Sequence, residues 1–345
     1  MQSYINKNTC LCLLCAIVLI MTACNNNKKV PDVSHIQVNV KIARFDTALF
    51  NIDTNNVAPG LHKLAGEYPV FLPVFIEHIM NFGPYADSSR LVQEQTHMFL
   101  TNHDFKALQQ AVTAKYPTLE NVEKELAQAF RYTKYYLPAF HIPKVVSFIS
   151  GIGNYGAVTA DTLLGIGLDM YMGADFPPYG MIPDYPAYMV RRFSPEYIAT
   201  NCMQVLQQEL YPPSSKANQL IAQMIEAGKQ QYFLDMVLPY TPDTIKLGYT
   251  KDQLDWCLEN EQLVWQYFIQ NNLLYSTDWQ EMTYYMGDGP ATRGMPPGSP
   301  GKIGNFIGWR IVTQYIARHP EVTLQQLLET TDQMKIFNGA KYKPR

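Results

Sequence analysis

The sequence predicts an α+β fold that is predominantly helical and carries a small β-sheet. Apolar residues recur with helical spacing over most of the chain. Apolar and β-branched residues instead alternate at 36–42 and gather at 144–150, 157–160 and 163–169, with a glycine-rich turn at 151–156. The roughly 310 residues from 34 to 345 are enough for one large core, so we expect a single globular domain over this range.

The first 24 residues have the pattern of a secretory leader and not of the fold. Lys7 gives a basic start, and an apolar run follows at 11–21. Met21-Thr-Ala-Cys24 resembles a bacterial lipobox, which implies cleavage before Cys24 and lipidation of its thiol. The alternative is an uncleaved membrane anchor, but about 11 apolar residues are too few to span a bilayer. We therefore expect a signal peptide at 1–24, a polar tether at 25–33 and attachment to a lipid bilayer through acylated Cys24.

Composition excludes several classes of protein. Hydrophobic residues make up 47% of the chain and charged residues 17%, which is typical of a globular and not a disordered chain. The net charge is −3 and no basic run occurs, which argues against a nucleic-acid partner. Cys202 and Cys257 lie on apolar helix faces, and either a disulfide or two buried free thiols is compatible with an oxidising compartment. The absence of an acidic cluster after Cys24 favours the periplasmic side of the envelope.

Start and stop signals place several helices. Residues 194–196 combine a cap, a proline and an acid at a helix start. Gly228 is expected to stop a helix, with a separate short helix at 229–238. Thr250 and Gln253 form a capping box, and an apolar stripe follows from 254 to 269.

The segment after Pro300 predicts a helix that is packed on two sides and runs to about residue 319. Three apolar residues and Arg310 share one face, whereas glycines share another, where a second backbone can approach closely. The residues are Ile303, Phe306 and Ile307 on the first face, and Gly301, Gly304 and Gly308 on the second.

Glu261 lies at the centre of the apolar stripe, while Glu259 points roughly the opposite way. A carboxylate on an apolar face needs a cation, a metal or a proton, because a bare buried charge is costly. We therefore expect Glu261 to be buried against Arg310, with Arg192 as the second choice. Such a pair is either a structural salt bridge or part of a binding or catalytic site.

Two loops supply the other candidate residues. The loop after the strands, 171–188, is rich in tyrosine and aspartate, which is typical either of a sugar or peptide groove or of a packed, hydrogen-bonded loop. A Gly/Pro/Thr loop at 282–300 carries a further arginine. The candidate binding cleft therefore comprises Tyr171, Asp175, Tyr179, Arg192, Glu261, Arg293 and Arg310.

The order of these parts resembles that of gluzincin metallopeptidases. In that family one helix carries His-Glu-x-x-His and a second supplies a third ligand, often as Asn-Glu. Asn260-Glu261 matches the second element. At the first, Pro195 and Ala199 stand where both histidines belong, although Glu196 is kept, and no His-Glu-x-x-His occurs. The resemblance implies a degenerate, metal-free peptidase-like cleft, with Glu196 and Glu261 as the only acid or base candidates.

A resemblance covering nearly the whole mature chain is to the gliding motility-associated lipoprotein B family (GldB) of the Bacteroidetes. The stretches that carry it are Arg44-Phe-Asp, 167–173, 196–198, Trp256 with Asn260-Glu261 and Trp265, 274–278, 299–304, 307–312 and 342–344. It implies a cell-envelope lipoprotein whose partners are proteins of the gliding and type IX secretion machinery.

No catalytic residues are established for that family that this chain inherits. We therefore expect a non-enzymatic binding or accessory component without a cofactor or metal. Two alternatives stay open: a zinc-dependent or carboxylate-based hydrolase, and a glycan-binding lipoprotein that uses the 171–188 loop.

Overall fold

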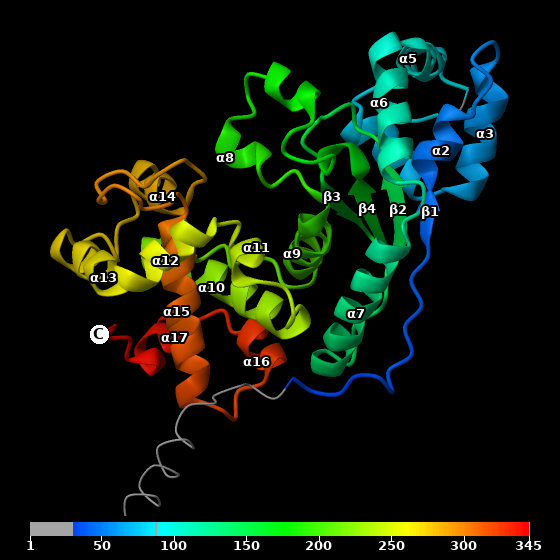
Figure 1. The fold of residues 1–345 in the computed structure, drawn as a ribbon. Helices are drawn as coiled ribbons and strands as arrows, with labels where there is room; N and C mark the ends of the chain where they lie inside the picture. Colours follow the sequence, from blue (N-terminus) through cyan, green and yellow to red (C-terminus); the bar gives the residue numbers. More distant parts are fainter. Residues whose placement is uncertain (1–29, 87, 345) are drawn as a thin grey trace, which may run out of the picture. The chain divides into compact units, whose positions relative to one another are not determined.

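The computed structural model describes residues 30–86 and 88–344. The chain divides into two units, Met1–His35 and Ile36–Arg345. The described part of the first unit contains only a turn, and the predicted signal peptide, Cys24 and most of the tether lie outside the described residues. The second unit holds the fold (Figure 1).

The second unit is predominantly helical with one small mixed sheet, as the sequence predicts. The strands are β1 (Ile42–Arg44), β2 (Lys144–Phe148), β3 (Ala157–Ala160) and β4 (Leu163–Gly167). Their order is β1-β2-β4-β3, with β1, β2 and β4 parallel and β3 antiparallel to β4. The carboxyl ends of β2 and β4 therefore meet at one edge of the sheet.

Helices before the sheet form an aromatic core against it. Phe45 packs edge to face on Phe71 and Phe75, and Phe75 packs edge to face on Phe148 of β2; all four side chains are fully buried. The helices of this region are α2 (Phe45–Phe50), α3 (Val57–Glu67), α4 (Phe71–Val74), the π-helix η1 (Phe75–Ile79), α5 (Arg90–Thr101), α6 (His103–Lys115) and α7 (Glu120–Tyr136).

The remaining helices follow β4. Short 3-10 helices and α8 come first: η2 (Leu168–Met170), η3 (Pro177–Met181), α8 (Ala187–Val190) and η4 (Pro195–Tyr197). The longer elements are α9 (Ile198–Leu210), α10 (Leu220–Val237), α11 (Asp243–Leu247), α12 (Lys251–Glu259), α13 (Glu261–Gln270), α14 (Trp279–Met286), α15 (Ile303–Arg318), α16 (Leu324–Glu329) and α17 (Gln333–Ala340). Helix α9 packs against β3 and β4, and α10 packs along α15 (Figure 1).

The predicted strand at 36–42 is wrong except at its last residue, because only Ile42–Arg44 pairs with the sheet. Val38 and Val40 are buried, which explains the alternation. Side chains of α7 bind this extended segment instead of a neighbouring strand: Glu123 accepts from the Ile42 N–H at 3.0 Å, and Arg131 donates to the Val38 carbonyl at 3.4 Å. Alternation of apolar and polar residues shows that one side of an extended segment is buried. It does not show that the segment forms hydrogen bonds with a neighbouring strand.

The predicted helix stop at Gly228 and the separate helix at 229–238 are also wrong, since α10 continues through both. Gly228 is there for packing. A Cβ on Gly228 would lie 2.2 Å from the Gly308 carbonyl oxygen, and one on Gly308 would lie 1.7 Å from the Met224 carbonyl oxygen. The glycine side of α15 therefore meets the backbone of α10, as its spacing predicts.

The apolar stripe at 254–269 is divided between two helices. Thr250 and Gln253 form the predicted capping box of α12. This helix ends at Asn260, whose side-chain amide donates to the Trp256 carbonyl at 2.8 Å. The break turns Leu258 and Ile269 outward, and it places Glu261 at the first position of α13.

Candidate functional site

Glu261 is buried and paired with Arg310, which confirms that prediction. Arg310 donates from Nε to Glu261 Oε1 at 2.9 Å, and the Tyr342 hydroxyl donates to the same oxygen at 2.5 Å. Only 9% of Glu261 is exposed, whereas 36% of the Arg310 side chain is. Burial and the Glu261 carboxylate raise the pKa of Tyr342. The first turn of α13 also favours a negative charge at this position.

This arrangement joins three distant parts of the chain. Glu261 begins α13, Arg310 lies in α15, and Tyr342 follows α17. Trp265 packs edge to face on Tyr342, with ring centroids 4.9 Å apart. A buried carboxylate that accepts from a guanidinium and a phenol at a contact between helices has the geometry of a structural ion pair. The pairing therefore fits the structural alternative better than an acid–base role.

The structure does not assemble Glu196 and Glu261 as a pair of acid–base groups. Glu196 is exposed on η4 and lines a cavity of about 460 Å³ together with Tyr240, Glu125 and Gln128. No hydrogen bond or ion pair joins the two carboxylates among the described residues. In the same part of the chain, no group of three or more His, Cys, Asp or Glu side chains is placed to hold a metal ion.

The tyrosine-rich loop at 171–188 is packed inward in large part. Tyr171 is 1% exposed and Tyr179 is fully buried. The Tyr179 hydroxyl donates to the Asp169 carbonyl at 2.6 Å and accepts from the Met172 N–H at 3.0 Å. The Tyr179 hydroxyl is therefore used inside the loop, which is the packed, hydrogen-bonded alternative for this residue. Asp175, in contrast, is exposed.

A buried carboxylate, Asp169, lies where the carboxyl ends of β2 and β4 meet. Its Oδ2 accepts from the Ser150 N–H and hydroxyl, both at 3.0 Å, and from the Ile152 N–H at 2.6 Å. Its Oδ1 has no hydrogen-bond partner among the described residues. Burial raises the pKa of Asp169, although these hydrogen bonds oppose the shift. Ile152 adopts φ +62°, an uncommon conformation for a β-branched residue, to present its N–H.

The two remaining candidate arginines lie in separate contacts. Arg192 pairs with Asp288, which also lies 3.5 Å from the Lys302 ammonium. Arg293 donates to the Tyr284 hydroxyl at 2.8 Å, and its guanidinium lies over the ring of Tyr284. The seven candidate cleft residues are thus dispersed. Of the pairs predicted from them, the structure forms Glu261 with Arg310.

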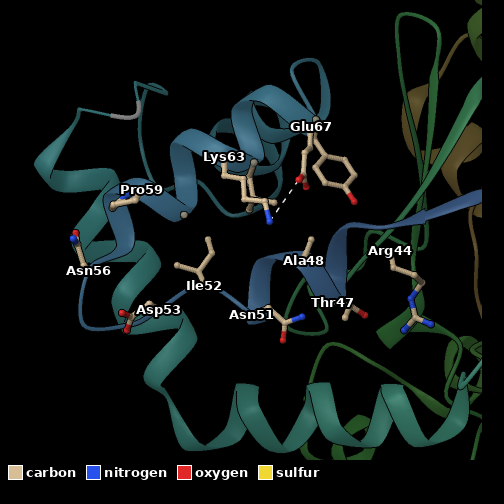
Figure 2. A pocket seen from close by; sticks show the side chains of 13 residues that line it. Arg44, Thr47, Ala48, Asn51, Ile52, Asp53, Asn56, Pro59, Lys63 and Glu67 are labelled. Atoms are coloured by element: carbon tan, nitrogen blue, oxygen red, sulfur yellow. Dashed lines mark ion pairs between the residues drawn. The ribbon is translucent and has the colours of Figure 1, made fainter.

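The structure contains a groove between α2 and α3 that sequence reasoning missed (Figure 2). Its volume is about 630 Å³, and side chains from both helices and their connecting loop line it. Most of the labelled side chains are polar, and Figure 2 shows Lys63 and Glu67 of α3 forming an ion pair, 3.7 Å apart, above α2. The polar lining includes Arg44, Thr47, Asn51, Asp53, Asn56, Lys63 and Glu67.

The Arg44-Phe-Asp stretch anchors one end of this groove. The Arg44 guanidinium donates to both carboxylate oxygens of Asp46, at 2.7–3.2 Å, and to the Tyr116 carbonyl at 2.9 Å. Asp46 also accepts from the Ser147 hydroxyl of β2 at 2.6 Å and is 1% exposed. This network fixes the start of α2 to the sheet. The signal was present in the sequence, since Arg44-Phe-Asp carries part of the family resemblance.

The fold and these contacts define a mainly helical α+β protein with a small mixed sheet and buried, charge-paired helix contacts. A sequence model of the family described as gliding motility protein GldB matches residues 26–344. The chain therefore belongs to the GldB family, as the sequence motifs predict. No curated protein and no solved structure matches it. The gluzincin likeness accordingly stays a sequence resemblance.

Proposed function

We propose that this protein is a lipid-anchored accessory component of the gliding or type IX secretion machinery that acts by binding a protein partner. The observation that carries the proposal is the family match over residues 26–344. The match begins at residue 26 and does not include Cys24, so cleavage and lipidation there rest on the lipobox-like Met21-Thr-Ala-Cys24. Among the described residues, no helix is long and apolar enough to cross a membrane.

Binding is favoured over hydrolysis by the state of the two carboxylates considered as acid or base. Glu261 is held by Arg310 and Tyr342, and Glu196 is exposed at a separate cavity. A general acid or base needs a free position for proton transfer and a substrate within hydrogen-bond reach. The groove between α2 and α3 instead offers exposed donors and acceptors on a rigid base, which suits recognition of a polypeptide.

The anchoring part of the proposal is tested with Cys24→Ser. We expect the variant to lose lipid labelling and to leave the membrane fraction or accumulate unprocessed. We also expect it to fail to restore colony spreading, or secretion of a type IX cargo protein, in a strain that lacks the gene. Continued lipid labelling would refute lipidation at Cys24.

The groove is tested with a double substitution, Asn51→Ala with Lys63→Ala. Both side chains are exposed, so unfolding free energy should change by less than about 0.5 kcal/mol per site. The matched control is Lys106→Ala with Gln110→Ala on α6, where both side chains are also exposed. Loss of complementation and of cross-linking to one envelope protein in the first variant only would support the groove. Equal behaviour of both variants would exclude it.

A further inference from the structure

Three cationic side chains from two distant segments gather around a single carboxylate. Arg191 and Arg192 follow α8, and Lys302 is the residue immediately before α15. Asp288, in the loop between α14 and α15, pairs with Arg192 and lies 3.5 Å from Lys302. Arg191 adds no carboxylate of its own, because it donates to the Gly248 carbonyl at 2.5 Å and to the Gln253 amide oxygen at 3.1 Å.

The cluster therefore carries more positive than negative charge. Among the described residues, Asp288 is the one carboxylate that forms an ion pair with any of these cations, and it pairs with Arg192 and Lys302 but not with Arg191. The Nε of Arg192 is buried and has no hydrogen-bond partner in the same part of the chain. Burial, with the neighbouring Arg192, lowers the pKa of Lys302, and burial likewise lowers the pKa of Arg191. Partial burial of cations that outnumber their counter-charges is costly unless an anion joins them.

The backbone around the cluster is fixed. Lys302 adopts φ +58°, a left-handed conformation that is uncommon for a lysine. Its N–H donates to the Gly287 carbonyl at 3.0 Å, and its carbonyl accepts from the Tyr249 hydroxyl at 2.9 Å. A Cβ on Gly248 would lie 3.1 Å from the Arg192 side chain. The backbone contacts of Lys302 and the packing of Arg192 against Gly248 therefore hold these cations close together.

The site remains open to solvent. The side chains of Arg192 and Lys302 are 19% and 30% exposed, and that of Asp288 is 30% exposed. An external anion can therefore reach the cations beside Asp288. A carboxylate is the group that the cluster already holds internally, and the planar arginine fork matches carboxylate geometry.

We propose that Arg191, Arg192 and Lys302 form a binding site for a carboxylate carried by an acidic peptide segment. Asp288 holds the cations together in the free protein and competes with the incoming carboxylate. The inference rests on the proposed partner-binding role, and it names the chemistry that the partner presents. It does not use the groove between α2 and α3.

The test is a calorimetric titration of the full-length lipoprotein in neutral detergent. The probes are an acetylated, amidated tri-glutamate peptide, the matching tri-glutamine peptide, and inorganic phosphate at equal ionic strength. We expect the glutamate peptide to bind and the glutamine peptide not to bind. Phosphate that binds while the glutamate peptide does not would overturn the peptide assignment, and equal binding of both peptides would overturn the role of charge.

Variants separate a binding site from a structural ion pair. Lys302→Asn keeps the left-handed backbone accessible and should weaken the glutamate peptide about tenfold or more, since one charged partner is lost. Arg192→Gln should do the same. Lys341→Asn is the matched control, because Lys341 is exposed and also has positive φ, +46°. It should bind as the unchanged protein does.

Asp288→Asn gives the sharpest outcome. Removing the competing carboxylate should tighten binding of the glutamate peptide about tenfold. A purely structural network predicts the opposite, a loss of stability with no gain in peptide affinity. Weaker or unchanged affinity in a folded Asp288→Asn protein would therefore overturn the proposal. Because the titration uses purified protein, it can fail while the lipidation and complementation results stand.

Discussion

Replacing Glu261 by glutamine tests the most specific structural prediction. In the native protein one oxygen of Glu261 accepts from both Arg310, at 2.9 Å, and Tyr342, at 2.5 Å. Glutamine keeps one acceptor oxygen but removes the charge, and it places an amide donor where the carboxylate had an acceptor. The Arg310 guanidinium is left partly buried without a counter-charge.

The magnitude follows from the burial of the two partners. Breaking a fully buried ion pair costs about 3–5 kcal/mol, and a hydrogen bond to a charged group contributes about 1.5–3 kcal/mol. Glu261 is almost fully buried, but 36% of the Arg310 side chain is exposed, so water supports part of the guanidinium. We therefore expect Glu261→Gln to lower the free energy of unfolding by about 2 kcal/mol, which is less than for a fully buried pair and within the range for a hydrogen bond to a charged group.

The assay is urea unfolding of the full-length protein in neutral detergent, followed by tryptophan fluorescence. Glu259→Gln is the control, since Glu259 is exposed and two residues away, and it should cost less than about 0.5 kcal/mol. Tyr342→Phe should cost about 1.5–3 kcal/mol, because it loses a buried hydrogen bond to the charged carboxylate. Equal losses for the two glutamate variants would refute the buried pair. Unchanged stability with lost activity in cells would instead assign Glu261 to a binding site.

Three further outcomes are expected. Gly308→Ala should destabilise the protein by about 3 kcal/mol or more, because the added Cβ would collide with α10. Gly66→Ala, where the added Cβ meets open space, should stabilise it by about 0.5–1 kcal/mol. Equal effects of the two variants in thermal unfolding would contradict the packing of α15 on α10. Burial raises the pKa of Asp169, so the folded protein favours the protonated carboxyl. The stability that this group contributes is greatest below its ordinary pKa of about 4 and is lost as pH rises through the folded pKa. Asp169→Asn should therefore be more stable than the native protein at pH 7 but not at pH 4. The buried free thiols of Cys202 and Cys257 should not react with a thiol reagent until the protein unfolds, and mass spectrometry showing a disulfide between them would contradict this.

Features that depend on local chemistry were predictable from the sequence. The capping box at Thr250 follows from residues three apart, and Asn102 accepts from the first N–H groups of α6. The predicted strand at 36–42 failed before Ile42 because this segment lies against α7, whose Arg131 donates to the Val38 carbonyl, and α7 begins at Glu120, far along the chain. The predicted burial of Val38 and Val40 was correct, but local spacing does not determine which element packs against them.

The groove between α2 and α3 escaped prediction for a related reason. Its lining residues lie within one stretch of the sequence, from Arg44 to Tyr68, and their polar character gives no signal by itself. The concavity depends on how α2 is fixed, and Asp46 does this through Ser147, about a hundred residues later. A motif such as Arg44-Phe-Asp indicates that a contact matters, but the contact partner decides whether a hollow forms beside it.

The same requirement, that buried charges be balanced, applies to the predicted Glu261–Arg310 pair and to the unpredicted cluster of Arg191, Arg192 and Lys302. Glu261 needed a buried cation, and both Arg310 and Arg192 were candidates from sequence. Arg310 fits because it shares the contact between α13 and α15, while Arg192 is held by Asp288. The spacing of single charges along a helix therefore predicts ion pairs. It does not predict the cluster of Lys302 with Arg191 and Arg192 near Asp288, because the excess of positive charge arises only when segments about a hundred residues apart are brought together. A surplus of this kind requires a ligand or a solvent path to be tolerated, and this requirement is what makes the cluster a better candidate for recognition than the balanced pair.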